Sequence, residues 1–452
     1  MHLIDVLEEH AEETAFLWML RQRALRSWNY TPKDLARLDQ RLLAHLDGLL
    51  IGAEAAAEIL DPYLDGGEEG EAFAAAYTAV ASDVPVKIKR VFEAFEKAEG
   101  ETLDGIRHAL RHTSWPDVEL RMSRYLEADR PELIAAAIDV LSFRGSPNAF
   151  LVMHLFPERP AIVRTAALTA IERAVDANYM PRVEAILDEV EVLVQQAAPD
   201  NIDSTGHETA VSGTESEDKS IAPYRPAIEG PAAIQRAAMR AGFVLKSEKV
   251  PPLCRRIIQR RGANADEAFH LLGLAGEKGD QALLFEAVRD PKLQPYAILA
   301  LGDHGYADAI TPLLDMAQSG LIKDLRGVGY VVSRITGVDI ARDDLESWAD
   351  VEASRRGDGP TFDELDAEFT GVVDDPYEGL TPPDLEKLSP WFAANKSLFA
   401  ENIRLLQGMP MGSRIVHRVR PLGRVSSTSG IRVSVIEAHA QGVARFPWPD
   451  RR

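Results

Sequence analysis

The sequence is poor in cysteine, in aromatic residues and in long apolar runs. Cys254 is the single cysteine, so no disulfide can form within the chain, which fits a reducing compartment. Aromatic residues make up only 7% of the 452 positions, and alanine and leucine dominate the 46% that are hydrophobic. This composition favours helices over sheets. No apolar run approaches the ~20 residues that a membrane-spanning helix needs, so we expect a soluble, mostly helical protein without membrane association.

Positive charge and export signals are scarce as well. The chain has 71 acidic and 50 basic residues, a net charge of -21. The resulting field opposes approach to phosphate backbones and anionic lipids, so nucleic-acid binding is disfavoured. The first residues, MHLIDVLEEHAEETAF, have neither the basic start nor the apolar centre of a signal peptide. We expect a cytoplasmic location.

The short motifs of common enzyme and cofactor sites are also missing. The sequence has no phosphate-binding loop of the G-x-x-x-x-G-K-[ST] type, no C-x-x-C pair, no G-x-S-x-G elbow and no EF-hand loop. The stretch RGVGYVV (residues 326–332) has two glycines but neither the third nor the preceding strand of a dinucleotide site, so helix packing is the better interpretation. We expect a non-enzymatic protein with no catalytic, cofactor-binding or metal-binding residues.

Two local patterns have a functional and a structural interpretation. His108 and His112 lie four residues apart, which would place two imidazoles on one helical turn, but the glutamate of H-E-x-x-H is missing. Cys254 is followed by Arg255 and Arg256, which could lower the pKa of its thiol. Arginines on a helix more often face solvent, so the structural interpretation is favoured for both patterns.

Helix patterns cover the chain from its first residues. Thr31, Pro32 and Asp34 form a typical helix start, and a leucine face follows it until the stretch IGAE at residues 51–54, where we expect a break and a third helix from residues 53 to 64. Between residues 71 and 195, further helix patterns are separated by short breaks at Pro85, Gly100, Pro116, Pro131, Pro147, Pro160 and Pro181.

Three of the turns between helices have related sequences. They read LSFRGSPNAF, LAGEKGDQAL and LGDHGYADAI. In each turn a glycine is followed four residues later by an apolar residue. A glycine is expected where a helix ends with positive φ, and the apolar residue starts the next buried face. The predicted pairs are Gly145 with Ala149, Gly279 with Leu283, and Gly305 with Ala309.

The third turn brings Asp303, His304 and Asp308 together within six positions, as a metal or acid/base site would. The matching positions of the other turns hold residues of different charge, so a repeated ligand site is excluded. We interpret this stretch as the clearest copy of a repeated helix hairpin.

LGDHGYADAITPLL, preceded by DPKLQPYAILA, resembles the short HEAT-like repeat that also occurs in the phycobilisome-lyase group. The resemblance covers residues 117–190 and 231–335, and it implies an α-solenoid of short helix hairpins. The stretch FLWMLRQRALRSWNYTPKDLARLDQRLLAHLDGLLIG (residues 16–52) resembles a family of uncharacterised proteobacterial HEAT-like proteins. The segment RITGVDI (residues 334–340) resembles the same family. The genes of this family often lie near type VI secretion clusters. That family has no assigned catalytic residues.

The last 41 residues differ in composition from the rest. They hold eight arginines, two acidic residues and no lysine, whereas the first 411 residues carry 42 basic and 69 acidic residues. This basic tail is either a native β-leaning segment or the product of an off-frame sequence, and it departs from the resembled family.

We therefore predict an all-α protein with six regions along the chain. They are an N-terminal helical region (1–70), a first HEAT-like array (71–197), a disordered linker (198–230), a second array (231–340), an irregular or helical region (341–411) and a basic tail of doubtful fold (412–452).

The leading functional hypothesis is a scaffold that binds a protein partner with a basic surface on its concave face, as an accessory, adaptor or immunity factor of a type VI secretion system. A HEAT-like nucleic-acid enzyme of the DNA glycosylase type is an alternative, and a bilin-lyase-like protein is another. The glycosylase alternative would use two basic clusters, formed by Arg21, Arg23 and Arg26 and by Arg255, Arg256, Arg260 and Arg261.

Overall fold

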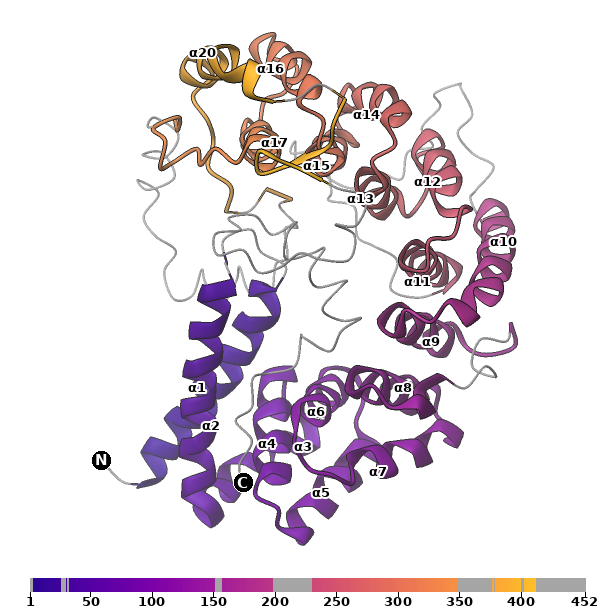
Figure 1. Ribbon diagram of the computed structural model, residues 1–452. Helices are drawn as coiled ribbons and strands as arrows, with labels where there is room; N and C mark the ends of the chain where they lie inside the picture. Colours follow the sequence, from indigo (N-terminus) through magenta and orange to yellow (C-terminus); the bar gives the residue numbers. More distant parts are fainter. Residues whose placement is uncertain are drawn as a thin grey trace, which may run out of the picture. The chain divides into compact units, whose positions relative to one another are not determined.

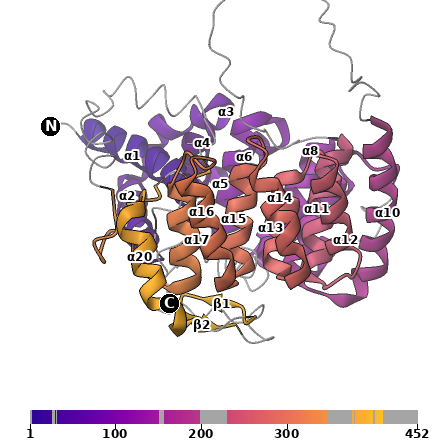
Figure 2. The same cartoon turned by 90° about the horizontal axis from the view of Figure 1, so that it is seen from above.

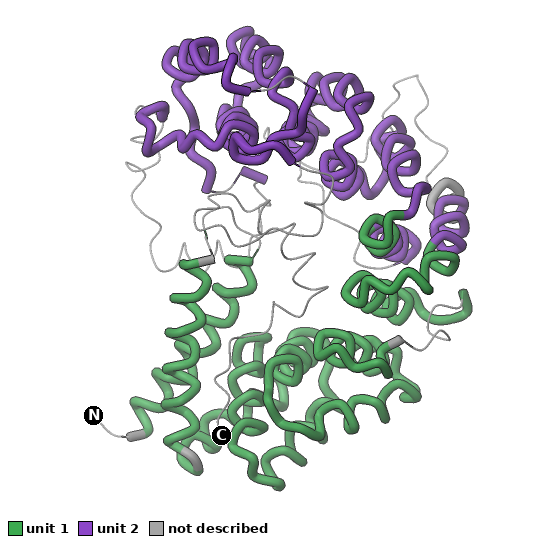
Figure 3. The backbone as a smooth tube through the Cα atoms, viewed as in Figure 1, with its two compact units in different colours: residues 1–183, 240–246, 413–452 green, residues 184–239, 247–412 purple. Residues whose placement is uncertain are grey.

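The computed structural model describes residues 3–25, 30, 32–150, 157–197, 230–347, 376–377, 379–399 and 402–411. The chain divides into two compact units (Figure 3). Unit 1 comprises residues 1–183, 240–246 and 413–452, and unit 2 comprises residues 184–239 and 247–412. The predicted linker, apart from Gly230, and the predicted basic tail lie outside the described residues, as do Thr31 and Arg26.

Unit 1 is built from helices (Figure 1). They are α1 (Leu3–Ala24), α2 (Pro32–Leu60), α3 (Tyr63–Gly66), α4 (Glu69–Ala81), α5 (Pro85–Lys97), α6 (Gly100–His112), α7 (Val118–Arg124), α8 (Pro131–Arg144) and α9 (Ala161–Ala174), with short 3-10 helices at Tyr125–Glu127, Pro147–Phe150 and Ala177–Tyr179.

Unit 2 holds most of two helices that begin or end near the unit boundary, α10 (Met180–Ala197) and α11 (Gly230–Val244). Its other elements are α12 (Val250–Gln259), α13 (Ala265–Ala275), α14 (Gln281–Val288), α15 (Gln294–His304), α16 (Ile310–Gln318), α17 (Arg326–Thr336), α20 (Leu385–Asn395), β1 (Leu405–Leu406) and β2 (Met409–Pro410), with 3-10 helices at Lys278–Asp280, Ala307–Ala309 and Lys396–Leu398.

The expectation of a mostly helical chain is confirmed. The paired strands of the described residues are only β1 and β2, which form an antiparallel hairpin of two residues each. Prolines start helices where the sequence predicted them. Pro85 and Pro131 occupy the first turns of α5 and α8, where the missing N–H has no helical partner to lose.

The predicted break at IGAE is wrong, because α2 continues through Gly52 to Leu60. Glycine in a helix costs only about 1 kcal/mol relative to alanine, which tertiary packing can offset. At Gly48 and Gly52 the neighbouring helix α1 lies so close that an added Cβ would be 2.6 Å from the His10 ring and 2.3 Å from Leu7. These glycines therefore allow α1 and α2 to pack closely.

In unit 1 one series of helices forms consecutive contacts along the chain. Helix α1 packs on α4, α4 on α6, α6 on α8, and α8 on α9, while α3, α5 and α7 pack on members of this series. Its core contains Trp18, which is fully buried and stacks on Phe73 with 3.6 Å between ring centroids. The apolar residues of α8 that are spaced at helical intervals, Ile134, Ala137, Ile138 and Leu141, are all buried.

Unit 2 repeats this pattern. Helix α13 packs on α15 and α15 on α17, while α12, α14 and α16 pack on α13, α15 and α17 respectively. In Figure 1 these three outer helices lie on the same side of the α13, α15 and α17 series. The stretch RGVGYVV lies in a helix, α17, as predicted. Its two glycines lie close to residues much later in the chain. A Cβ at Gly327 would be 2.6 Å from Tyr377, and a Cβ at Gly329 would be 3.1 Å from Pro383.

The predicted alignment of the three turns is right for two and wrong for the middle one. Gly145 and Gly305 end α8 and α15 with φ of 77° and 78°, and Ala149 and Ala309 are buried. In the middle turn Gly276, with φ of 65°, ends α13. Gly279 lies instead in a 3-10 helix, and Leu283 is only half-buried. The residue four positions after Gly276 is Asp280, which is buried although it is charged. The expectation of an apolar residue at this position therefore shifted the alignment to Gly279.

Residues 404–408, which we name the C-terminal strap, cross the C-terminal ends of three helices. Arg404 donates hydrogen bonds to carbonyl oxygens of Gly273 in α13 and of Asp303 and His304 in α15, at 2.9–3.2 Å. The backbone amide of Leu405 donates to Gly305, and those of Gln407 and Gly408 donate to Arg334 and Ile335 of α17. Figure 2 shows the β1–β2 hairpin at one end of these helices.

The strap supplies hydrogen bonds to carbonyls that have no partner within their own helices, and its guanidinium suits the negative end of a helix. Substituting Arg404→Ala should therefore lower the free energy of unfolding by about 2 kcal/mol, the usual range for hydrogen bonds from a charged group. Urea denaturation followed by circular dichroism measures this change. Arg260→Ala, which removes an exposed arginine of the same unit, is the control, and equal midpoints for the two variants would contradict the prediction.

Candidate functional site

Asp303, His304 and Asp308 do not converge on a common point. The Asp303 carboxylate is buried and accepts a hydrogen bond from the Tyr330 hydroxyl at 3.0 Å. His304 is fully buried, and its Nε2 donates to the carbonyl oxygen of Glu277 at 2.9 Å. Asp308 pairs with Lys278. Two of the three side chains are therefore interior residues with separate structural partners.

Asp303 links the three helices of its series. From α13, His270 Nδ1 lies 3.4 Å from its carboxylate, and from α17 the Arg334 guanidinium lies at 3.3 Å, beside Tyr330. Burial alone would raise the pKa of Asp303, but His270, Arg334 and Tyr330 stabilise the ionised form and hold the pKa below its usual value. Asp303 thus stays charged inside the protein because each neighbouring helix supplies a donor.

Asp139 has the same role in unit 1. Arg107 from α6 lies 2.6 Å from its carboxylate and Arg173 from α9 lies 2.9 Å away, while Arg111 from α6 also bonds to it. Burial opposes ionisation, but the three guanidinium groups hold the pKa of Asp139 well below its ordinary value of 3.8. The buried cluster has more positive than negative charge. The Asp139 carboxylate therefore offsets the cost of burying the guanidinium groups.

His108 and His112 are buried on the α6 face but do not point to a shared ligand. His108 Nδ1 bonds to a carboxylate oxygen of Glu69 in α4 at 2.8 Å. The His112 ring packs edge-on against Trp18 and Phe143, at 5.4 and 5.0 Å between ring centroids. Burial, only partly opposed by Glu69, lowers the pKa of His108 to about 4, and burial beside Arg21 and Arg111 holds the pKa of His112 well below its ordinary value. Both rings are neutral core residues at neutral pH.

Cys254 and its arginines face different environments. The thiol is buried, and burial, together with the nearby Glu267, raises its pKa far above the ordinary value. Arg255 bonds to Asp280 and Glu277, and Arg256 bonds to Glu191 at 2.7 Å. The arginines therefore pair with carboxylates rather than activating the thiol, and the cysteine is unreactive in this environment.

The remaining arginines of the two basic clusters differ in burial and in pairing. Arg21 is buried and bonds to Asp39 of α2 at 2.7 Å. Arg261 pairs with Asp290 at 2.5 Å, whereas Arg23 and Arg260 lie on the exposed surface. Most of the positive charge that a duplex would need is thus balanced by neighbouring acids.

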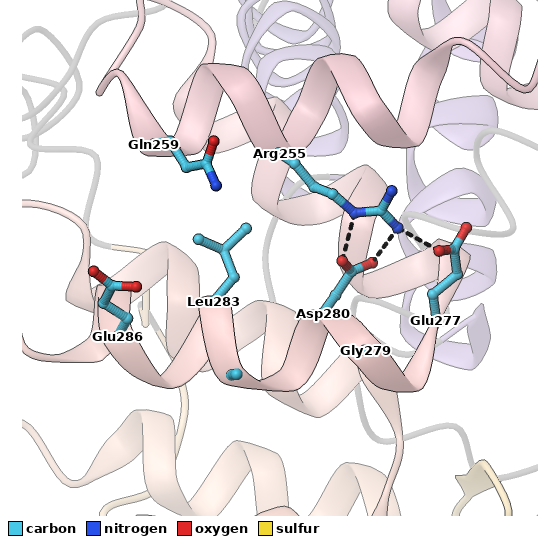
Figure 4. A pocket seen from close by; sticks show the side chains of 8 residues that line it. Arg255, Gln259, Glu277, Gly279, Asp280, Leu283 and Glu286 are labelled. Atoms are coloured by element: carbon cyan, nitrogen blue, oxygen red, sulfur yellow. Dashed lines mark hydrogen bonds and ion pairs between the residues drawn. The ribbon is translucent and has the colours of Figure 1, made fainter.

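A surface groove with a volume of about 520 Å³ lies between α12 and α14 of unit 2 (Figure 4). In Figure 4 Arg255 and Gln259 project from the upper helix, and Asp280, Leu283 and Glu286 from the lower one. Arg255 Nε donates to Asp280 at 2.6 Å across one end, and Glu277 closes that end. The lining comprises Arg255, Gln259, Glu277, Gly279, Asp280, Ala282, Leu283 and Glu286.

The groove combines an apolar patch with excess negative charge. Leu283 is half-buried at its centre, and Glu286 and Gln259 are exposed at the end away from Arg255. The lining holds three carboxylates and a single guanidinium, so it favours a cationic or amide-bearing ligand with an aliphatic stem.

The groove was not predicted from the sequence. Arg255 was expected in a basic cluster and Leu283 at the start of a buried face, whereas both line the groove at the surface. The signal that could have indicated the ion pair is the pair of acids Glu277 and Asp280, which follow the CRRIIQRR cluster after one intervening helix. Opposite charges on alternate helices of a repeat of helix pairs favour an ion pair between them.

Among the described residues, no group of three or more histidine, cysteine, aspartate and glutamate side chains is arranged to hold a metal ion. In the same part of the chain, every helix is too short or too polar to cross a membrane.

Comparison with known proteins adds no family. The sequence matches no protein-family model, and a search of curated proteins gives no significant match. The resemblance to HEAT-like repeats and to a family encoded near secretion clusters therefore remains a prediction from the residues themselves.

Substituting Asp139 should lower the stability of unit 1 strongly. Asp139→Asn keeps its size but leaves Arg111 and Arg173 without a counter-charge and Arg107 with only the half-exposed Asp104, so the free energy of unfolding should fall by about 3 kcal/mol or more. Asp104→Asn removes a half-exposed partner of Arg107 and should cost less than about 1 kcal/mol. Chemical denaturation of both variants tests this, and equal losses would show that the buried charge has no special role.

The same carboxylate predicts a pH dependence. Its folded pKa is below the unfolded value, so its stabilisation is fully present above about pH 4 and is lost as the pH falls toward the folded pKa. Wild type should therefore lose stability more steeply than Asp139→Asn between pH 4 and the acid limit of folding, as measured by thermal unfolding at stepped pH. Parallel curves would contradict the assignment.

The buried thiol gives a simple chemical readout. Cys254 should fail to react with a thiol reagent such as dithionitrobenzoate at pH 8 in the folded protein, and should react stoichiometrically in denaturant. Rapid labelling of the native protein would show that the site opens or that the thiol is activated.

Proposed function

We propose that this protein is a non-enzymatic, cytoplasmic HEAT-like scaffold whose helix pairs stack as an α-solenoid and bind a protein partner with a basic surface. The observation that carries the proposal is the acidic groove between α12 and α14. Its three carboxylates beside the apolar side chain of Leu283 suit the charged end and the aliphatic stem of a lysine or arginine from the partner.

Support for the stacked arrangement comes from the spacing of bonded side chains. Arg107 and Asp139 are 32 residues apart in the chain, Arg236 and Asp266 are 30 apart, and Lys278 and Asp308 are 30 apart. Bonds that recur at one nearly constant separation join equivalent helices of successive hairpins. This is the pattern that a repeat with nearest-neighbour contacts requires.

The electrostatics favour a basic partner over a nucleic acid or lipid. Glu277 and Asp280 pair with Arg255 at one end of the groove and Glu286 lies at the other end, so the lining has three carboxylates and one guanidinium, an excess of negative charge with the same sign as the net charge of the whole chain. A phosphate-bearing ligand would be repelled by both. A lysine or arginine of a partner could place its aliphatic stem on Leu283 and its charge between Glu286 and the groove wall.

The proposed role in secretion rests on the resemblance of residues 16–52 and 334–340 to the family encoded near secretion clusters. Within it, an accessory, adaptor or immunity factor is the kind of protein that would need a recognition surface and no catalytic residues.

The test is affinity capture with the whole protein from a proteobacterial lysate at low and moderate salt, followed by a binding assay with the purified protein that is enriched. We expect a basic partner whose affinity falls at least tenfold with the double variant Glu277→Lys and Glu286→Lys, because reversed charges repel it. Glu248→Lys, at an exposed position of the same unit, makes a matched control and should leave binding unchanged.

Failure to enrich any protein at both salt concentrations would remove the support for a scaffold. Enrichment of a partner that binds the double variant as well as wild type would place the interaction elsewhere and contradict the role of the groove.

A further inference from the structure

Two histidines on different helices of unit 1 face each other at close range. His10 lies in α1 and His45 in α2, and their Nδ1 atoms are 3.0 Å apart. The ring planes are nearly perpendicular, at 74°, with centroids 5.1 Å apart. The pair is partly buried, so it can be reached from solvent.

The helix packing holds this pair in place. Gly48 of α2 lies against the His10 ring, and a side chain there would have its Cβ 2.6 Å from the imidazole. The Thr14 hydroxyl bonds to the His10 carbonyl within α1. The two imidazoles are thus carried by a long helix pair that brings them together before any ligand binds.

The distance between the nitrogens is what a shared metal ion requires. An imidazole nitrogen binds zinc at about 2.0–2.1 Å, so two such ligands at an angle of about 90–110° have their nitrogens about 2.9–3.4 Å apart. The observed 3.0 Å falls in this range. Small side-chain rotations would then turn both lone pairs toward one ion, at little cost in conformational freedom.

Charged groups of both helices lie around His45. Burial, followed by His10 and Arg41, lowers the pKa of His45, while Glu13 and Glu9 oppose the shift. Neutral imidazole is the form that binds a metal ion. The two glutamates on α1 add negative potential around the site.

We propose that His10 and His45 form a two-imidazole binding site for a divalent transition-metal ion of the zinc or copper type. Each Nδ1 donates one lone pair to the ion, and water completes the coordination. In the empty pair one ring must carry its proton on Nδ1 to make the hydrogen bond. On binding, that proton passes to Nε2 of the same ring through solvent, so no net proton is released.

The site should discriminate by ligand chemistry. Imidazole nitrogen suits zinc, copper and nickel, whereas magnesium and calcium require oxygen ligands. The proposal is independent of the acidic groove, which lies in unit 2 and contains no histidine.

The test is isothermal titration of the full chain with Zn²⁺, with Mg²⁺ as the negative control. We expect a site of one ion per chain with micromolar affinity, weakened at least tenfold by His10→Gln and by His45→Gln. His207→Gln removes a histidine from the segment between α10 and α11 and should leave this site unchanged. Circular dichroism of each variant establishes that the helices remain.

A second measurement on the unaltered chain guards against misfolding of the variants. Electron paramagnetic resonance with one equivalent of Cu²⁺ should show coupling to two imidazole nitrogens. Zinc affinity that is equal in wild type, His10→Gln and His45→Gln, or a copper spectrum with a single coupled nitrogen, overturns the proposal.

Discussion

The structure depends on charged side chains that are buried between helices and neutralised by the next helix in the series. An isolated charge in the interior costs several kcal/mol, and its partner must come from a fixed direction and distance. Asp139 and Asp303 meet this requirement with donors from the helices before and after them. Apolar faces alone would let α6, α8 and α9 slide against one another, whereas a buried carboxylate with defined partners fixes their register.

The two units satisfy this requirement with different chemistry. Asp139 is surrounded by three guanidinium groups, so its cluster carries excess positive charge. Asp303 instead receives one guanidinium, one hydroxyl and one imidazole, which are milder donors with a smaller desolvation cost. The two carboxylates share a role without sharing a position, because Asp139 lies six residues before Gly145 and Asp303 lies two residues before Gly305, which is why a repeat motif does not reveal them.

Much of the fold was predictable from the sequence, because helix starts and apolar spacing are local signals. Proline at the first turn and left-handed glycine at the last turn locate α8 and α15 correctly. The errors arose where tertiary contacts override local preference. Gly52 continues a helix because α1 needs the space, and the middle turn is misaligned because a buried charge, Asp280, occupies the position expected for an apolar residue. The candidate groove was not predictable, since it requires knowing which two helices face each other.

The C-terminal strap has a consequence for the order of folding. Arg404 bonds to Gly273 across 131 residues of sequence, far beyond the spacing of about thirty residues that joins neighbouring hairpins. A chain emerging from the ribosome can form α13, α15 and α17 from nearby contacts, but their carbonyl ends stay uncapped until the strap has been synthesised. Unit 2 therefore combines fast local assembly with one late, long-range closure, and truncation before residue 404 would leave its helices formed but frayed at one end.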